Sequence, residues 1–323
     1  MQRWLDLRDV PAGYGPSVVT IGNFDGVHRG HQAVLRRVVE TARAHSARAV
    51  AVTFEPHPRA VLFPERAPAA LTTAEHRLEL LERTGLDAVL VMEFTRELAR
   101  WSPERFVVDT VVRALHAVTV VVRPDMRFGH RNSGDVATLR ELGAVHGFGV
   151  DLVEDLGPAG GRRWSSTWVR ELLAAGRVEE AAAVLGRPHR VSGTVVHGDH
   201  RGRELGYPTA NLGGDGGGLV PADGVYAGRL VRLALPQDAP DRRLPAAVSI
   251  GTNPTFDGVA RRVEAYVLDR TDLDLYGEPV AVELLRRLRP TLRFDGIEPL
   301  VTQMALDVEQ CRAVLGVGSR FGR

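Results

Sequence analysis

The first half of the chain alternates short runs of β-branched residues with longer amphipathic segments. The apolar runs predict strands at 18–22, 48–54, 87–92, 118–122 and 149–154. The segments between them predict helices at 30–46, 73–84, 103–116 and 134–146. This alternation is typical of an α/β fold with a parallel, doubly wound sheet. Such a sheet binds ligands beyond the carboxyl ends of its strands, where the strand order reverses, so we expect a site at that edge.

The pattern changes around Gly186-Arg-Pro188. From Arg190 onward, segments that alternate apolar and polar residues are separated by Gly, Pro and Asp turns, which predicts a small antiparallel β-barrel. The clearest of these segments are 191–196, 225–235, 246–251 and 263–268. A final helical pattern carries apolar residues from Ile297 to Leu315, and we expect this helix to pack on the barrel. The sequence therefore predicts two domains, residues 1–186 and 187–323.

Charge and composition exclude several classes of protein. The chain has 41 basic residues, all of them Arg, against 40 acidic ones, so its net charge of +1 predicts neither a nucleic acid nor a membrane as partner. Without lysine, a Walker-type P-loop and a Schiff-base mechanism are excluded. No apolar run reaches the length of a membrane span and Cys311 can form no internal disulfide, so we expect a cytoplasmic location. The oligomeric state stays open, a transient homo-oligomer included.

The segment Ile21-Gly-Asn-Phe-Asp-Gly-Val-His28-Arg-Gly-His31 joins the first predicted strand to the first predicted helix. The N–H groups and the dipole of a helix start favour an anion. His28 and His31, one turn apart, can direct ring N–H groups at the same phosphate, each bond worth about 1.5–3 kcal/mol. The segment therefore predicts a nucleotide site that works by positioning and electrostatics. The alternative is a pair of ordinary surface histidines in a strand–helix turn.

A second segment, Arg163-Trp-Ser-Ser166-Thr167-Trp-Val-Arg170, follows the fifth predicted strand and opens a helix. The two hydroxyls and Arg170 can hold the β- and γ-phosphates of a nucleotide, in place of the missing lysine. Serine and threonine are also ordinary helix caps, so this segment alone leaves both interpretations open.

A third segment, Gly202-Arg203-Glu-Leu-Gly206-Tyr207-Pro208-Thr209-Ala-Asn211, lies at the start of the predicted barrel. Its glycines allow a loop to fold over phosphates, with Arg203 as the charge. Thr209 and Asn211 face the same side if the chain is extended, and hydroxyl and amide oxygens are hard ligands that suit Mg²⁺. Glu264 lies on a later predicted strand and, from the residues alone, is one carboxylate among many.

Together these segments resemble the motifs of the prokaryotic bifunctional riboflavin kinase/FAD synthetases, and the resemblance extends over essentially the whole chain. It also includes Phe54-Glu-Pro-His-Pro58 after the second strand. The resemblance implies that the C-terminal barrel phosphorylates riboflavin to FMN. It implies that the N-terminal domain adenylylates FMN to FAD and releases pyrophosphate. ATP would be the co-substrate of both steps, and Mg²⁺ would serve both.

The resemblance also implies roles for individual residues. Those at the chemistry are His28, His31, Arg170 and Glu264, with Glu264 as the base for the ribityl hydroxyl. Those that contact nucleotide or flavin in the first site are Gly22, Asn23, Asp25, Pro56, His57, Pro58, Asp125, Phe128, Arg163, Ser166 and Thr167. Those that contact substrates in the second site are Gly202, Arg203, Gly206, Tyr207 and Pro208. The implied Mg²⁺ ligands are Thr209 and Asn211.

The chain departs from the family pattern where a Gly-x-[Asp/Asn]-Phe-x-Phe-Gly turn is usual, because it has Arg123-Pro124-Asp125-Met126-Arg-Phe128-Gly129. Trp164 and His200 also replace smaller residues. These departures keep open an enzyme with one working site, whose other domain binds flavin or acts as a scaffold. Another adenylyl- or cytidylyltransferase with a binding barrel is a further alternative. The Pro-Thr-Ala-Asn segment argues against it, because a barrel that only binds needs no Mg²⁺ ligands.

Overall fold

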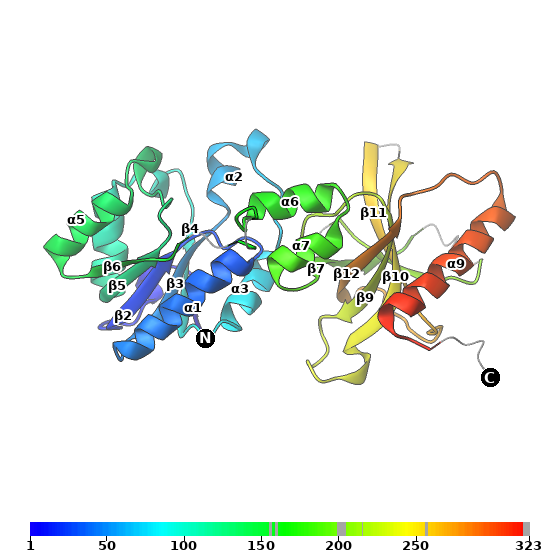
Figure 1. Cartoon of the computed structure of the whole chain (residues 1–323), viewed down its shortest axis with the longest axis horizontal. Helices are drawn as coiled ribbons and strands as arrows, with labels where there is room; N and C mark the ends of the chain where they lie inside the picture. Colours follow the sequence, from blue (N-terminus) through cyan, green and yellow to red (C-terminus); the bar gives the residue numbers. More distant parts are fainter. Residues whose placement is uncertain (155–156, 159–160, 199–204, 215, 256–257, 319–323) are drawn as a thin grey trace. The chain divides into compact units, whose positions relative to one another are not determined.

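The computed structural model describes residues 1–154, 157–158, 161–198, 205–214, 216–255 and 258–318 (Figure 1). Its contacts divide the chain into two compact units, Met1–Ala69 with Ala74–Ser165, and Ala70–Thr73 with Ser166–Arg323. This division falls before the boundary expected after Gly186, because the last helix before Gly186 packs on two barrel strands and the helix before it packs on that helix. The boundary between the functional domains at 186/187 stays a prediction.

The first unit is built on a parallel sheet, as the sequence predicted, and the sheet has six strands rather than the five that were expected. Its strands are β1 (Gln2–Trp4), β2 (Ser17–Ile21), β3 (Arg48–Glu55), β4 (Ala88–Glu93), β5 (Ala117–Val122) and β6 (Gly149–Leu152). They lie in the order β1-β4-β3-β2-β5-β6. From β2 the chain proceeds outward to β3 and β4, then returns to place β5 on the other side of β2. The carboxyl ends of β2 and β5 therefore form the crevice at which the strand order reverses.

Helices cover both faces of this sheet. On one face they are α1 (Arg29–Ala44) and α3 (Ala74–Glu82). On the other they are α4 (Pro103–Phe106), which continues as a π-helix over Val107–Ala114, and α5 (Val136–His146). The short helix α2 (Pro58–Leu62) follows β3 and buries none of its residues. Consecutive strand residues point to opposite faces, so Val18 packs in a core with Leu35 of α1, whereas Val19 packs in the core that contains Phe106. Strands buried on both faces explain the nearly continuous apolar runs in the sequence.

The second unit contains a closed antiparallel barrel, also as predicted. Its strands are β7 (His189–Val196), β8 (Thr209–Leu212), β9 (Gly224–Arg232), β10 (Arg243–Thr255), β11 (Gly258–Val267) and β12 (Pro279–Arg289). Helices α6 (Ser166–Ala174) and α7 (Val178–Leu185) precede it, and α9 (Ile297–Leu315) packs on it through the buried Cys311. Within the described residues, no helix is both long enough and apolar enough to cross a membrane.

Candidate active sites

The first unit contains a cavity of about 1100 Å³ at the carboxyl ends of its strands. Its lining includes Ile21 at the end of β2 and Val122 at the end of β5, so the cavity opens where the strand order reverses. A volume of several hundred Å³ or more is typical of small-molecule sites. The cavity brings together seven of the predicted site residues: Gly22, Asn23, His31, His57, Pro58, Asp125 and Phe128.

The two histidines lie at the start of α1. His28 is the N-cap residue, and its Nδ1 accepts the backbone N–H of His31 at 3.3 Å, so the proton of a neutral His28 ring is on Nε2. The two rings stack with their centroids 3.7 Å apart. His28 is buried, whereas His31 lines the cavity. The Nδ1 atom of His31 is buried and has no hydrogen-bond partner among the described residues, which favours a ligand as its partner.

Burial lowers the pKa of His31 well below its usual value of 6.5, and the electrostatic interactions of the ring with His28 and with the Arg123 guanidinium lower it further. The ring is therefore neutral at pH 7 and carries one N–H group. A phosphate bound next to it would favour the charged form and raise the pKa again. Binding of an anion next to His31 and protonation of its ring are therefore coupled.

Asp125 lies between two guanidinium groups at the same cavity. Its carboxylate is 3.3 Å from Arg123 and 2.9 Å from Arg163. Arg123, which stands where the related family usually has glycine, therefore adds a cation to the cavity lining and is held in place by Asp125. The buried Phe128 packs against Phe106, with ring centroids 6.2 Å apart.

The remaining predicted residues of this site lie in three places. Asp25 is buried in the turn before α1 and Pro56 lies in the loop after β3, and neither is among the described residues that line the cavity. Next to Pro56, His57, which lines the cavity, caps α2 by accepting the N–H of Arg59 at 3.1 Å. Ser166, Thr167 and Arg170 lie in α6, whose predicted start is confirmed, and α6 groups with the second unit.

Sequence reasoning missed much of the cavity wall. Aromatic rings come from Phe54, Phe94, Trp101 and Phe106. The available signal was that 94–101 follows the carboxyl end of β4, which shares its edge of the sheet with β2. The wall also carries several arginines: Arg59, Arg96, Arg100, Arg123, Arg127 and Arg131. Asp125 is the one acidic residue among the described lining residues, so the cavity favours anionic ligands.

The second unit brings Thr209, Asn211 and Glu264 together. Strand pairing places Asn211 of β8 directly opposite Glu264 of β11. The Thr209 hydroxyl donates to the Glu264 carboxylate at 3.5 Å, and the Asn211 amide donates to the Thr209 hydroxyl at 3.4 Å. A Cβ at Gly198 would lie 2.4 Å from the Asn211 amide nitrogen, so only glycine allows this approach. Thr209 and Asn211 thus share one side, as the spacing predicted.

The loop before β8 is described in part. Gly206 has a φ of +85°, a left-handed conformation that glycine adopts without strain. Tyr207 packs edge-on against Tyr266 of β11, with centroids 5.3 Å apart, and Pro208 follows it into β8. Gly202 and Arg203, which were predicted to contact phosphates, lie outside the described residues, as does His200.

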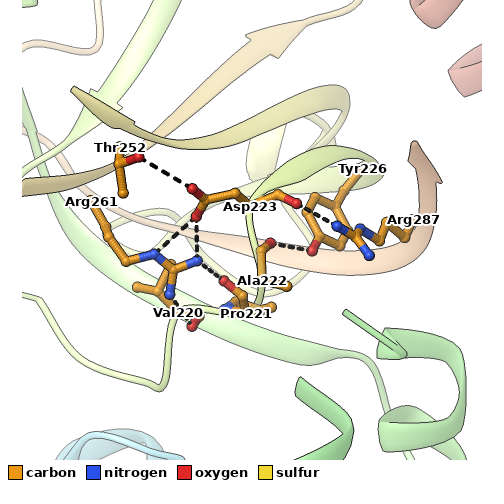
Figure 2. Close-up of polar contacts among 8 residues, drawn as sticks. All are labelled: Val220, Pro221, Ala222, Asp223, Tyr226, Thr252, Arg261 and Arg287. Carbon is orange, nitrogen blue, oxygen red and sulfur yellow. Dashed lines mark hydrogen bonds and ion pairs between the residues drawn. The ribbon is translucent and has the colours of Figure 1, made fainter. Parts of the chain in front are cut away.

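A polar cluster ties the segment before β9 to the barrel (Figure 2). The Arg261 guanidinium of β11 donates to the Asp223 carboxylate at 2.7 Å and to the Val220 carbonyl at 2.9 Å. The Thr252 hydroxyl of β10 donates to the same carboxylate at 3.4 Å. Arg287 of β12 donates to the Asp223 carbonyl at 2.5 Å. These contacts fix the entry to β9 and brace β11, the strand that carries Glu264.

The two units together define a two-domain transferase that uses nucleotides. The FAD synthetase family model matches residues 12–168, and the riboflavin kinase family model matches residues 185–315. The chain belongs to the bifunctional riboflavin kinase/FMN adenylyltransferase family, with its two domains in the predicted order.

Curated relatives match over nearly their full length. The bifunctional riboflavin kinase/FMN adenylyltransferase of Escherichia coli K12 is 37% identical over 300 residues, which cover 93% of each chain. That of Pseudomonas fluorescens is 38% identical over 315 residues, 97% of this chain and 98% of the relative. A crystal structure described as a macrolide-efflux protein from Streptococcus pneumoniae has a TM-score of 0.83 and 31% identity, covering 96% of this chain and 98% of its own.

Proposed function

We propose that the cavity of the first unit adenylylates FMN, and that the Thr209, Asn211 and Glu264 cluster of the second unit phosphorylates riboflavin. The observation that carries the first assignment is His31, whose buried Nδ1 has no described partner and which faces an arginine-lined cavity at the reversal of strand order. The second assignment rests on three oxygen-bearing side chains that strand pairing brings within hydrogen-bond distance.

In adenylyl transfer, a phosphate oxygen of FMN attacks the α-phosphorus of ATP, the new P–O–P bond forms, and pyrophosphate leaves. The attacking group is already an anion, so no protein nucleophile is needed. The N–H groups of His28 and His31 and the guanidinium groups of Arg123 and Arg163 stabilise the charge that develops on the phosphates. Arginine is suited to this work because its planar fork binds phosphate through two hydrogen bonds.

The substrate contacts of this site are proposed from the motifs and the cavity lining. Gly22, Asn23 and Asp25 belong to the loop proposed to hold the nucleotide. Pro56, His57 and Pro58 belong to the loop proposed to hold the flavin, with Phe128 on the aromatic wall. For Ser166, Thr167 and Arg170, the proposed contact with the triphosphate rests on the sequence motif alone.

In the kinase reaction, the ribityl 5′-hydroxyl of riboflavin attacks the γ-phosphorus of ATP, the new P–O bond forms, and ADP leaves. Glu264 is proposed to take the proton of that hydroxyl, since a carboxylate can act as a general base for a substrate hydroxyl that binds within hydrogen-bond distance of it. Its position on a paired strand fixes it opposite Asn211. The loop with Gly202, Arg203, Gly206, Tyr207 and Pro208 is proposed to close over the phosphates.

Thr209 and Asn211 are the proposed holders of Mg²⁺ in the second unit. Their hydroxyl and amide oxygens, next to the Glu264 carboxylate, are the hard donors that Mg²⁺ prefers. In the described part of the chain, no group of three or more His, Cys, Asp or Glu side chains could hold a metal, so these oxygens and the substrate phosphates are the fitting ligands. When bound, Mg²⁺ neutralises charge on the polyphosphate. A cytoplasmic location stays a prediction, as do the oligomeric state and the exclusion of nucleic acid.

The test is a product assay that resolves FMN from FAD with riboflavin, ATP and Mg²⁺. Glu264→Ala is expected to stop FMN formation while FMN supplied directly still becomes FAD. His31→Ala is expected to let FMN accumulate. Glu298→Ala on α9 and His45→Ala after α1 are matched controls at exposed positions. A step that stays within about threefold of wild type, less than 1 kcal/mol in barrier, contradicts that role. If wild type forms FMN from riboflavin but no FAD, or forms FAD from supplied FMN but no FMN from riboflavin, only one site works.

A further inference from the structure

Arg77 is a buried cation that none of the assignments above uses. It lies on α3, and its side chain is only 6% exposed. Burying a charge is costly unless the charge is paired and hydrogen-bonded. The hydrogen-bond partners of Arg77 therefore indicate its role.

Those partners come from the ends of two neighbouring strands. The guanidinium donates to the Glu55 carboxylate at 2.6 Å and to the Phe54 carbonyl at 3.2 Å, both at the end of β3. Its other terminal nitrogen donates to the Asn23 carbonyl, in the loop after β2, at 3.4 Å. The guanidinium group thus joins the end of β3, which leads into the loop with His57, to the loop after β2 through three hydrogen bonds.

Both of these segments contribute residues to the cavity lining. Asn23 and its neighbour Gly22 line it from the loop proposed to hold the nucleotide. Phe54 and, beyond it, His57 line it from the side proposed to hold the flavin. Arg77 itself is not among the described lining residues, so it can affect the cavity only through the residues that it holds.

We propose that Arg77 is a positioning residue for adenylyl transfer, which sets the separation of the nucleotide loop from the flavin loop. The inference rests on the function proposed above. In a reaction between two bound substrates, a displacement of about 1 Å can cost roughly 100-fold in rate. Arginine can span the two loops because its donors point in fixed directions, whereas the ammonium of lysine is a single point.

The experiment compares Arg77→Lys with Arg83→Lys, a matched change at an exposed position just beyond α3. FAD formation is measured with FMN supplied directly. For Arg77→Lys we expect kcat to fall by about 30-fold or more while KM for FMN and for ATP stays within about threefold, since each loop keeps its own ligand contacts. Riboflavin phosphorylation by the same protein is expected to be unchanged. Arg83→Lys is expected to match wild type in both reactions.

Two further variants separate positioning from stability. Glu55→Gln removes the ion pair but leaves both carbonyl contacts, and is expected to change kcat by less than about threefold. Arg77→Gln is expected to lose kcat as Arg77→Lys does. Thermal melts give the folded fraction, and rates are compared per folded protein.

Three results would overturn the inference. One is an Arg77→Lys kcat within about threefold of wild type. Another is a loss that disappears when rates are expressed per folded protein, which would make the role structural. The third is a rise in KM with kcat unchanged, which would mean that Arg77 supports binding of one substrate. If wild type forms no FAD from FMN at all, the proposed function fails with it.

Discussion

At the scale of single residues, the environment of His31 decides its charge. Burial and the electrostatic interactions with His28 and Arg123 keep the ring neutral, whereas the sequence alone does not reveal its charge. Arg123 is the unusual member of this set, because it replaces the glycine of the family pattern. The effect of the Arg123 charge on the pKa of His31 can be measured.

Arg123→Gln is expected to raise the pKa of His31 toward its usual value, since one positive charge leaves the vicinity of the ring. Burial still acts, so we expect the pKa to remain below 6.5. At about pH 6 a larger fraction of His31 is then protonated than in wild type. NMR titration of the His31 ring protons, assigned with His31→Gln, measures the shift. An unchanged or lower pKa would contradict the proximity of Arg123.

A linked effect on stability follows from the same shift. The pKa of His31 is lower in the folded chain than in the unfolded chain, so the neutral ring contributes its full stability above about pH 6.5. That contribution is lost as the pH falls through the folded-state value. Because Arg123→Gln raises the folded-state pKa of His31, it narrows the pH range between the folded-state and unfolded-state pKa values over which this stability is lost.

At the scale of elements, the Asp223 cluster connects a loop to β10, β11 and β12 (Figure 2). Asp223→Ala leaves Arg261 and Thr252 without their shared carboxylate. Hydrogen bonds to a charged group contribute roughly 1.5–3 kcal/mol, and these residues are about one-third exposed, so we expect a loss near the lower end. Urea denaturation followed by circular dichroism measures it, with Asp238→Ala as an exposed control. Equal midpoints for the two variants would contradict a bracing role.

Most elements could be predicted from sequence periodicity. The predicted strand at 48–54 is β3, and the predicted terminal helix is α9. β1 could not be predicted, because three residues show no period and its pairing with β4 is a contact between distant segments. The helix predicted over 103–116 becomes a π-helix after Phe106, a change of hydrogen bonding that apolar spacing does not reveal.

The site divides in the same way. His28 and His31 lie in one motif at a strand–helix junction, so local sequence was enough to find them. Arg77 and Trp101 were missed, because their roles depend on which helix or loop packs behind which strand end. Their positions depend on tertiary packing, and one sequence taken by itself contains little information about that packing.

At the scale of the whole molecule, one chain has two units with one proposed site in each. Because the product of one reaction is the substrate of the other, inactive variants should complement each other. A mixture of His31→Ala and Glu264→Ala proteins is expected to convert riboflavin to FAD. The first alone should stop at FMN, and the second alone should make neither product.

The complementation is measured by chromatography of the flavins at equal protein concentrations. The double variant His31→Ala/Glu264→Ala alone, at the same total protein concentration, is the negative control, because it is expected to have neither activity. Failure of the mixture, with both single variants active in their own remaining step, would contradict release of FMN into solution between the two steps.

The closed barrel has one further consequence. Each of its described strands has a neighbouring strand on both sides, so no strand of the barrel is left unpaired along one whole side. The parallel sheet differs, because β1 and β6 each have one unpaired side, over three and four residues. Addition of a foreign strand to the parallel sheet would therefore occur at β1 or β6, and charged substitutions in these two strands are expected to hinder it.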